Sequence, residues 1–376
     1  MPDAISIDNP KLRIGDDLEW AERSEYWRAH EPAGRRGRRR KFKYREPLII
    51  CGHGARIRVD RGTLLIRNGF THFPQKSEEI RYFPGDPNLP NRIIILDGSG
   101  GISFDALDWM SEQKIEFVRL DWRGRATSIG GNSGYAANPK LVQVQWEIQG
   151  TKRQLEIARW LVAEKLEASI ATLNELFPKS EIRENVIARL KSDILEIRKS
   201  RKSISLSRVF GIEGRCAVAY FKVWHGLPLK WRGTGRKPIP NDWLEIVPRN
   251  MAWRKRARAA RHPLNAMLNY GYGILANEVR SQAIAAGLDP TIGIIHGNSE
   301  NPIPLVYDLM EPLRPTVDQR VLGFALSLEF TPGDFTISKW GGCRLNPQLA
   351  GALVKSIAGV LDVAPAVRSF VRALVG

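Results

Sequence analysis

Short apolar runs and turn residues alternate between residues 46 and 128. The segments PLIICG, ARIRVDRGTLLIRNG and NRIIILDG are rich in β-branched residues and end at Gly or Asn-Gly and Asp-Gly pairs. Polar and apolar residues alternate with a period of two over 56–60, as in a strand with one buried face. Residues 102–113 fit one helix, and KIEFVRLDWRG at 114–124 fits a further strand. The pattern predicts a small β-rich unit with one helix.

Helical spacing of the apolar residues replaces this pattern from about residue 138. It extends over 140–174 and, with many charges on the opposite face, over 181–198. Residues 16–30 are also compatible with a helix, which would place Trp20 and Trp27 on one face. Further helices are expected at 211–227, 264–286, 305–313 and 347–374.

The two patterns together predict an α+β protein with two domains and an extension. We expect an N-terminal extension over 1–44, a small β-rich domain over 45–135, and a larger all-α domain over 136–376. The glycine-rich stretches at 98–101 and 130–134 lack the Lys-Ser/Thr pair of a phosphate-binding P-loop, so we interpret both as loops or linkers.

The charge balance indicates a polyanionic partner. The 376 residues contain 57 Lys and Arg against 40 Asp and Glu, a formal net charge of +17. Nucleic acid is the first expectation, and a basic solvated surface without a specific partner is the alternative. No apolar run approaches the roughly 20 residues that span a bilayer, and the polar N-terminus does not have the pattern of a signal peptide. We expect no membrane association and a cytoplasmic location. The three widely spaced cysteines predict neither a disulfide framework nor a zinc module.

Two stretches concentrate this charge. GRRGRRRKFK at 34–43 is a dense basic run, and 230–261 is a loop-prone basic stretch with Trp231, Trp243 and Trp253 among its cations. Aromatic rings between cations suit distorted or unpaired nucleic acid, whereas the alternative is that the tryptophans are core residues. The candidate DNA-binding residues are Arg38, Arg39, Arg40, Lys41, Arg254, Arg256 and Arg258.

Four polar residues lie within largely apolar stretches of the sequence. Glu213 lies in GIEGRCAVAYF, His296 ends the run IGIIH, and Asp308 and Glu311 lie three apart in YDLMEP. Each has an ordinary structural interpretation: a helix start for Glu213, a satisfied core or edge residue for His296, and a solvated helix start for the two acids. A helical turn would place Asp308 and Glu311 on one face, where a cation between them would relieve their repulsion.

Together these residues offer carboxylate oxygens and an imidazole. Such donors suit Mg²⁺ or Mn²⁺, and the imidazole favours Mn²⁺. A divalent cation beside a phosphodiester could stabilise the charge that develops during phosphoryl transfer and lower the pKa of an attacking hydroxyl. Residue types and spacing alone leave this hypothesis open beside the structural interpretations.

Four motifs in a fixed order resemble a known family. GIEGRCAVAYF at 211–221, HPLNAMLNYGYGILANEV at 262–279, GLDPTIGIIHGN at 287–298 and LVYDLMEPLRP at 305–315 are similar to the CRISPR-associated adaptation integrase and endonuclease, the universal first Cas protein family. The resemblance extends from about residue 45 to the C-terminus. It implies a β-rich N-terminal domain joined to an all-helical catalytic domain.

The resemblance also implies a site and a reaction. Glu213, His296 and Asp308 match the family's metal ligands, and Glu311 matches a further acid near the metal, so these four are the expected catalytic residues. The implied reaction is transesterification, in which the 3′-hydroxyl of captured DNA attacks a phosphodiester of the CRISPR repeat. No ATP is needed, which agrees with the missing P-loop. The implied partners are double-stranded DNA, a second copy in a homodimer, and a small ferredoxin-like adaptation subunit, in a prokaryotic cytoplasm.

The sequence departs from the family pattern at three places. Residues 1–44 precede the usual first strand, Val218 stands where an arginine is frequent, and His262 stands where an aspartate is frequent. None of these removes an expected metal ligand. The alternatives to an active integrase are a DNA-binding scaffold on the same fold and a structure-specific nuclease that works outside CRISPR.

Overall fold

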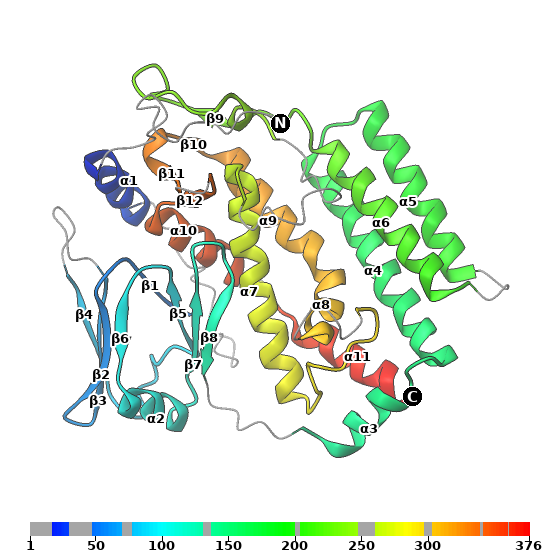
Figure 1. Ribbon diagram of the computed structural model, residues 1–376, viewed down its shortest axis with the longest axis horizontal. Helices are drawn as coiled ribbons and strands as arrows, with labels where there is room; N and C mark the ends of the chain where they lie inside the picture. The colour runs from blue at the N-terminus through cyan, green and yellow to red at the C-terminus, as the bar shows by residue number, and fades with distance from the viewer. Residues whose placement is uncertain are drawn as a thin grey trace.

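The computed structural model describes residues 17–29, 47–69, 77–130, 137–199, 204–246, 260–296, 303–338, 341–359 and 361–376. Sheets occupy the early part of this chain and helices most of the rest (Figure 1). Within these ranges, no helix is both long and apolar enough to cross a membrane.

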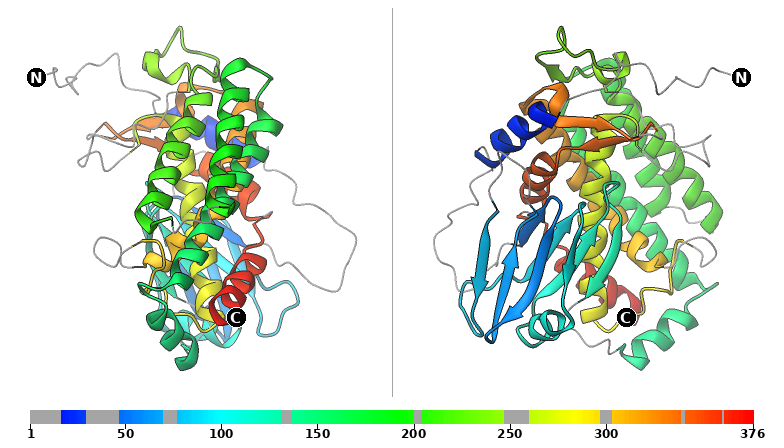
Figure 2. Two further views of the ribbon diagram at one scale, coloured as in Figure 1. Left: turned by 90° about the vertical axis from the view of Figure 1, so that its right-hand side faces the viewer. Right: turned by 60° about the vertical axis from the view of Figure 1, so that its left-hand side comes forward.

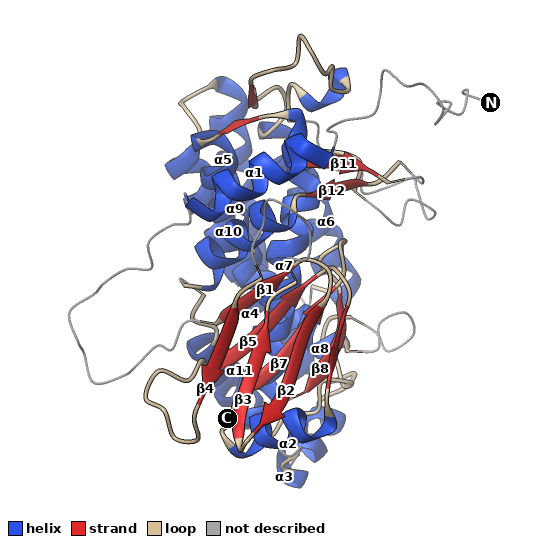
Figure 3. Cartoon of the chain, turned by 90° about the vertical axis from the view of Figure 1, so that its left-hand side faces the viewer, coloured by secondary structure: helices blue, strands red, loops and turns tan. Residues whose placement is uncertain are grey.

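The early part contains two four-stranded sheets. One has the order β1-β5-β7-β8, with β1, β5 and β7 parallel and β8 antiparallel, and the other has the order β4-β3-β2-β6. Figure 3 shows the strands in front of the helices. The strands are β1 (Leu48–Cys51), β2 (Ala55–Asp60), β3 (Thr63–Arg67), β4 (Glu79–Tyr82), β5 (Arg92–Leu96), β6 (Gly100–Ile102), β7 (Glu116–Leu120) and β8 (Ala126–Gly130).

The alternation seen in the sequence places one face of each sheet in a shared core. Ile57, Leu64 and Ile66 of the second sheet pack with Ile93 and Phe117 of the first. Helix α2 (Phe104–Glu112) closes one end of this core, and Ser103 caps its N-terminus by accepting from Ala106 N. The predicted strands and the single predicted helix of this region are confirmed.

Long helices form the later part of the chain. The helix α4 lies centrally and packs against α5, α6 and α9. Figure 2 shows α4, α5 and α6 running side by side. The helices of this part are α3 (Pro139–Glu147), α4 (Lys152–Leu176), α5 (Glu181–Lys199), α6 (Leu206–Val223), α7 (Pro263–Ala285), α8 (Pro304–Met310), α9 (Arg314–Ser327), α10 (Pro347–Ala358) and α11 (Ala364–Val375), with 3₁₀ turns η2 (Asn241–Trp243), η3 (Glu311–Leu313) and η4 (Pro332–Asp334).

The later part is not purely helical, which corrects the expectation of an all-α domain. β9 (Lys230–Trp231) pairs with β10 (Glu329–Phe330), and β11 (Phe335–Ile337) pairs with β12 (Cys343–Leu345). The predicted helix over 347–374 is divided into α10 and α11. The predicted helix over 140–174 is divided at Gly150, whose φ of 74° belongs to the left-handed region that glycine adopts easily.

The tryptophans of the basic stretch are core residues where the structure describes them. Trp231 and Trp243 stack with centroids 5.9 Å apart, and both contact Phe335. Trp243 is 1% exposed, and its indole N–H donates to Arg261 O. Trp243 is therefore not available to stack on nucleic acid in this conformation, and Trp231 is partly buried against the same core. Trp253 lies outside the described residues.

Helix α1 (Asp17–Ala29), the described part of the extension, docks on the later part of the chain through Asp334. This carboxylate is fully buried and accepts from Trp27 Nε1 at 2.5 Å and from Arg23 Nε at 2.7 Å. Trp27 also stacks on Phe324, with centroids 5.9 Å apart. The predicted helix is confirmed, and a buried ion pair attaches it to the fold.

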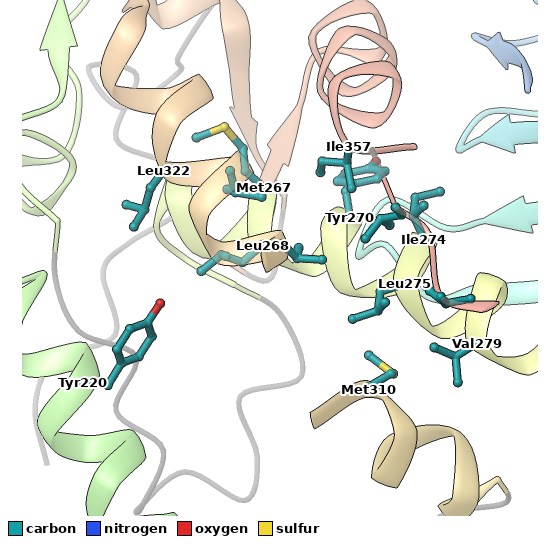
Figure 4. Packing of buried hydrophobic residues seen from close by; sticks show 14 of the residues in the cluster. Tyr220, Met267, Leu268, Tyr270, Ile274, Leu275, Val279, Met310, Leu322 and Ile357 are labelled. Carbon is teal, nitrogen blue, oxygen red and sulfur yellow. The ribbon is translucent and has the colours of Figure 1, made fainter. Parts of the chain in front are cut away.

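The outer face of the first sheet packs on α7 and α10. Figure 4 shows the buried side chains along α7, with Met310 of α8 and Ile357 of α10 among their neighbours. Arg92 of β5 is buried between Glu116 of β7, 2.5 Å away, and Glu278 of α7. This shared arginine links the sheet to the helix, because its buried charge would be strongly destabilising without the two carboxylates.

Two backbones touch where the sheet meets α7. A Cβ atom on Gly273 of α7 would come within 1.8 Å of Gly124 O, so this contact requires glycine. We expect Gly273→Ala to reduce the free energy of unfolding by about 3 kcal/mol, because the methyl group must push the strand connection away. Urea unfolding followed by circular dichroism measures this change.

Gly323 of α9 is the matched control, because a Cβ there would meet no atom within 4 Å. Gly323→Ala should raise the free energy of unfolding by up to about 1 kcal/mol through helix propensity. Equal changes at the two positions would contradict the close contact between sheet and helix.

Candidate active site

Residues from several segments meet in one cavity of about 340 Å³. Helix α4 contributes Lys165, α6 contributes Glu213, and the chain before and after α8 contributes His296 and Glu311. Arg314, Tyr272 and Asp318 also line it. Segments more than 100 residues apart in sequence thus bring charged side chains into one cavity within a largely apolar core.

Glu213 lies in the middle of α6. The helix begins at Leu206, where Ser205 accepts from Arg208 N as the N-cap. The interpretation of Glu213 as a helix-start residue is therefore wrong. Its carboxylate faces α4 and pairs with the Lys165 ammonium. A mid-helix position gives the carboxylate a fixed direction into the cavity.

Asp308 does not line the cavity; it lies fully buried behind His296. Its carboxylate accepts from the backbone N–H groups of Ile294 at 2.5 Å, Ile295 at 3.0 Å and His296 at 2.9 Å. His296 Nδ1 lies 2.6 Å from Asp308 Oδ1. We assign the donated proton to Nδ1, because the carboxylate can only accept, and this leaves Nε2 for the cavity. This hydrogen bond is also the main cause that raises the pKa of His296.

Lys165 lies between two carboxylates from different elements. Its ammonium pairs with Glu213 and, at 2.5 Å, with Glu311 Oε2. Burial would lower the pKa of Lys165, but Glu311 and Glu213 outweigh it and raise the pKa. Burial would likewise raise the pKa of Glu311, yet Lys165 and Arg314 hold it below its usual value. Arg314 lies 3.3 Å from Glu311 Oε1. At neutral pH the cluster is therefore a set of paired charges.

A tyrosine and an acid form the wall behind these charges. Tyr272 donates to Asp318 Oδ1 at 2.5 Å, and the Arg314 guanidinium lies 5.5 Å from the centre of the Tyr272 ring. Burial raises the pKa of Asp318 to about 6 despite this hydrogen bond. Sequence reasoning missed Lys165, Tyr272 and Asp318. It also missed Arg314, although a local signal was available there, because Arg314 follows Glu311 by three residues.

The remaining predicted residues divide into two groups. Val218 is 64% exposed and lines the cavity, while His262 caps α7 by accepting from Leu264 N, which an aspartate would also do. The predicted DNA-binding residues fall outside the described ranges; they are Arg38, Arg39, Arg40, Lys41, Arg254, Arg256 and Arg258.

In this conformation the predicted metal ligands do not form a complete metal site. Across the described ranges, no three histidine, cysteine or acidic side chains lie close enough together to hold a metal ion. Glu213 and Glu311 both contact the Lys165 ammonium, and the oxygens of Asp308 accept from backbone N–H groups and face His296. The prediction that Glu213, His296 and Asp308 bind one metal ion remains a prediction.

Comparisons with known proteins point to one family. The family model for CRISPR associated protein Cas1 matches residues 48–358. A CRISPR-associated endonuclease Cas1 from Methanospirillum hungatei is 28% identical over 309 residues, which cover 80% of this chain and 83% of that protein. A casposase bound to its integration product has a TM-score of 0.66 and 26% identity, and the likeness covers 83% of this chain and 81% of that one. A Cas6-RT-Cas1–Cas2 complex has a TM-score of 0.62 at 17% identity, covering 89% of this chain and 35% of that one, and this shows the fold alone.

The fold, the cavity lined by paired charges and these relatives define an enzyme of the endonuclease and integrase class. The match to the family model covers most of the chain. The chain belongs to the CRISPR associated protein Cas1 family.

The contacts of Asp308 predict a large structural effect. We expect Asp308→Asn to lower the free energy of unfolding by about 2–4 kcal/mol, because its amide would present N–H groups to backbone N–H donors. Asp362→Asn is the control, since Asp362 accepts from Ala364 N in an exposed turn, and it should change stability by less than about 1 kcal/mol. Urea unfolding of both variants measures the difference. A small effect at Asp308 would show that its buried contacts contribute little.

Proposed function

We propose that this chain is a metal-dependent DNA endonuclease and integrase of CRISPR adaptation. It joins the 3′-hydroxyl of a captured DNA fragment to a phosphodiester of the repeat. The observation that carries the proposal is the convergence of Glu213, His296 and Glu311 on one cavity in a Cas1-family chain. With water in place of the 3′-hydroxyl, the same site would cleave DNA.

Glu213, His296 and Glu311 would hold the metal ion. The donor set fits, since carboxylates and an imidazole suit Mg²⁺ or Mn²⁺. Two features of the structure support the fit: a cation, the Lys165 ammonium, already lies between the carboxylates, and the buried Glu311 Oε2 has no hydrogen bond of ordinary geometry within the described residues. We assign Asp308 a different role from the one that the sequence predicted. It orients His296 through Nδ1, as carboxylates behind metal-binding histidines commonly do.

The side chains in and behind this cavity would have different roles in transesterification. A bound divalent metal ion would stabilise negative charge on the reacting phosphate and lower the pKa of the attacking hydroxyl. Asp308 keeps the proton of His296 on Nδ1 and so keeps Nε2 available. Arg314 balances part of the charge of Glu311 and adds positive charge at the cavity wall. Bonds broken and formed are of one kind, so no external energy source is required.

The substrate and the assembly follow from the same proposal. The net charge of +17 supports a duplex DNA substrate, and the basic residues near 38–41 and 254–258 would contact its phosphates. We propose a division into an extension (1–44), a β-rich domain (45–135) and a mainly helical domain (136–376). A homodimer joined by a small ferredoxin-like subunit is the proposed assembly, and the prokaryotic cytoplasm is the proposed location.

Removal of a proposed ligand tests the catalytic assignment. In a strand-transfer assay with a repeat-bearing plasmid and Mn²⁺, we expect Glu213→Gln, His296→Ala and Glu311→Gln each to reduce the rate at least about a hundredfold. A chelator should abolish the activity of the unaltered protein, and added Mn²⁺ should restore it. Glu175→Gln, on the exposed end of α4, should leave the rate unchanged.

The same assay distinguishes the enzyme from a DNA-binding scaffold. If DNA binding survives but no protein transfers strands with or without Mn²⁺, the scaffold alternative holds. The assay is run with and without the candidate partner subunit, so that a missing partner is not mistaken for a missing activity.

DNA binding should depend steeply on salt. We expect log K to fall linearly with log salt concentration for duplex DNA, and the slope to weaken by about 0.9 for each arginine lost that contacts a phosphate. Fluorescence anisotropy compares the triple alanine variant at Arg254, Arg256 and Arg258 with a control that loses the same charge at Lys179, Lys191 and Arg368. A flat response to salt, or equal slopes for both variants, would contradict the assignment of this stretch.

A further inference from the structure

The Lys165 side chain occupies an unusual place for an ammonium group. It projects from the middle of α4 and is 12% exposed. Its neighbours at positions i−4, i−3, i+1 and i+4 on the helix are all buried; they are Leu161, Val162, Leu166 and Ser169. An ammonium group in such surroundings is unfavourable unless opposite charges compensate it.

Two carboxylates compensate this charge, and they come from two other elements. Glu213 of α6 and Glu311 of η3 both contact the ammonium. The Glu213 side chain is 29% exposed and the Glu311 side chain is 6% exposed. The lysine therefore links α4, α6 and η3 at one point. Without a cation there, the two carboxylates would face each other across a partly buried space and repel.

The four side chains joined by these ion pairs carry charges that sum to zero in this arrangement. Lys165 and Arg314 carry two positive charges, and Glu213 and Glu311 carry two negative charges. A divalent ion that enters while the ammonium stays would add two uncompensated charges beside two cations. A divalent ion that replaces the ammonium would instead find both carboxylates available. The electrostatics therefore favour exchange over addition.

We propose that Lys165 is the resident cation of the catalytic centre, and that a divalent metal ion must displace its ammonium from Glu213 and Glu311 to bind. Lys165 is then a positioning residue with two effects. It holds the carboxylates in place before the metal arrives, and it raises the metal concentration at which the centre fills. This inference rests on the proposed function, because it assumes that Glu213 and Glu311 are metal ligands.

Metal binding by the full-length protein tests the proposal without any assay of activity. Free Mn²⁺ is measured by electron paramagnetic resonance during titration of the unaltered protein and of Lys165→Met, which retains the size of the side chain and removes its charge. We expect Lys165→Met to bind Mn²⁺ about tenfold more tightly or better. Lys152→Met, at an exposed position on the same helix, should bind as the unaltered protein does. Lys165→Arg keeps the charge and should show no gain.

A second measurement separates competition from a purely structural role. In urea unfolding without metal, Lys165→Met and Lys165→Gln should both be less stable than the unaltered protein, because the carboxylates lose their counter-ion. Saturating Mn²⁺ should remove most of that difference, since the ion replaces the lost charge. An equal loss of stability with and without Mn²⁺ would overturn the proposal, as would equal or weaker Mn²⁺ binding by the neutral variants.

Failure of the proposed function has a different signature. If Glu213→Gln and Glu311→Gln bind Mn²⁺ as tightly as the unaltered protein, these residues are not ligands, and both proposals fall together. If these two variants lose binding while Lys165→Met shows no gain, the metal site stands and the displacement of Lys165 is refuted.

Discussion

The charge balance around Lys165 is the interaction on which the rest of the site depends. Its ammonium joins carboxylates from α6 and η3 to the central helix α4. A lysine, a glutamate and a second glutamate would each be unfavourable alone at these depths, whereas together they are compensated. The same requirement for positive charge between the carboxylates makes the place suitable for a divalent ion. The stability of the metal-free site and its ability to bind a metal ion thus both depend on the two carboxylates around Lys165.

Asp308 and Glu311 are three residues apart, but Asp308 supports the backbone near the site and Glu311 lines the cavity. The sequence predicts Asp308 as a metal ligand and Glu311 as a further acid near the metal, but the two side chains have different surroundings. Asp308 is fully buried and accepts from three successive backbone N–H groups at 294–296, so it fixes the segment that carries His296. Glu311 instead reaches the cavity and meets cations. Between them α8 ends and the 3₁₀ turn η3 begins, and Asp308 faces the backbone at 294–296 while Glu311 reaches the cavity.

Buried charged residues attach both the first sheet and the N-terminal helix α1 to the helical part of the chain. Arg92 lies between carboxylates of β7 and α7, and Arg23 and Trp27 share the buried Asp334. Each contact joins segments distant in sequence through a buried charge that needs its partners. The close backbone contact of Gly273 with Gly124 adds a steric limit on how the sheet can sit.

The sequence by itself determined the elements and the family. Period-two and helical patterns located β1, β2, β3, β5, β7, α1, α2 and most later helices, because each depends on local spacing of apolar residues. They missed the other strands, including β6, which begins in the stretch 98–101 that we interpret from the sequence as a loop or linker. Ordered motifs singled out Glu213, His296, Asp308 and Glu311. Only the tertiary structure decided which acids face the cavity, since Lys165 gives no local signal and meets Glu213 and Glu311 only after α4, α6 and η3 pack together. The pairing of these buried charges joins residues that are far apart in the sequence, so a short stretch of sequence cannot predict it.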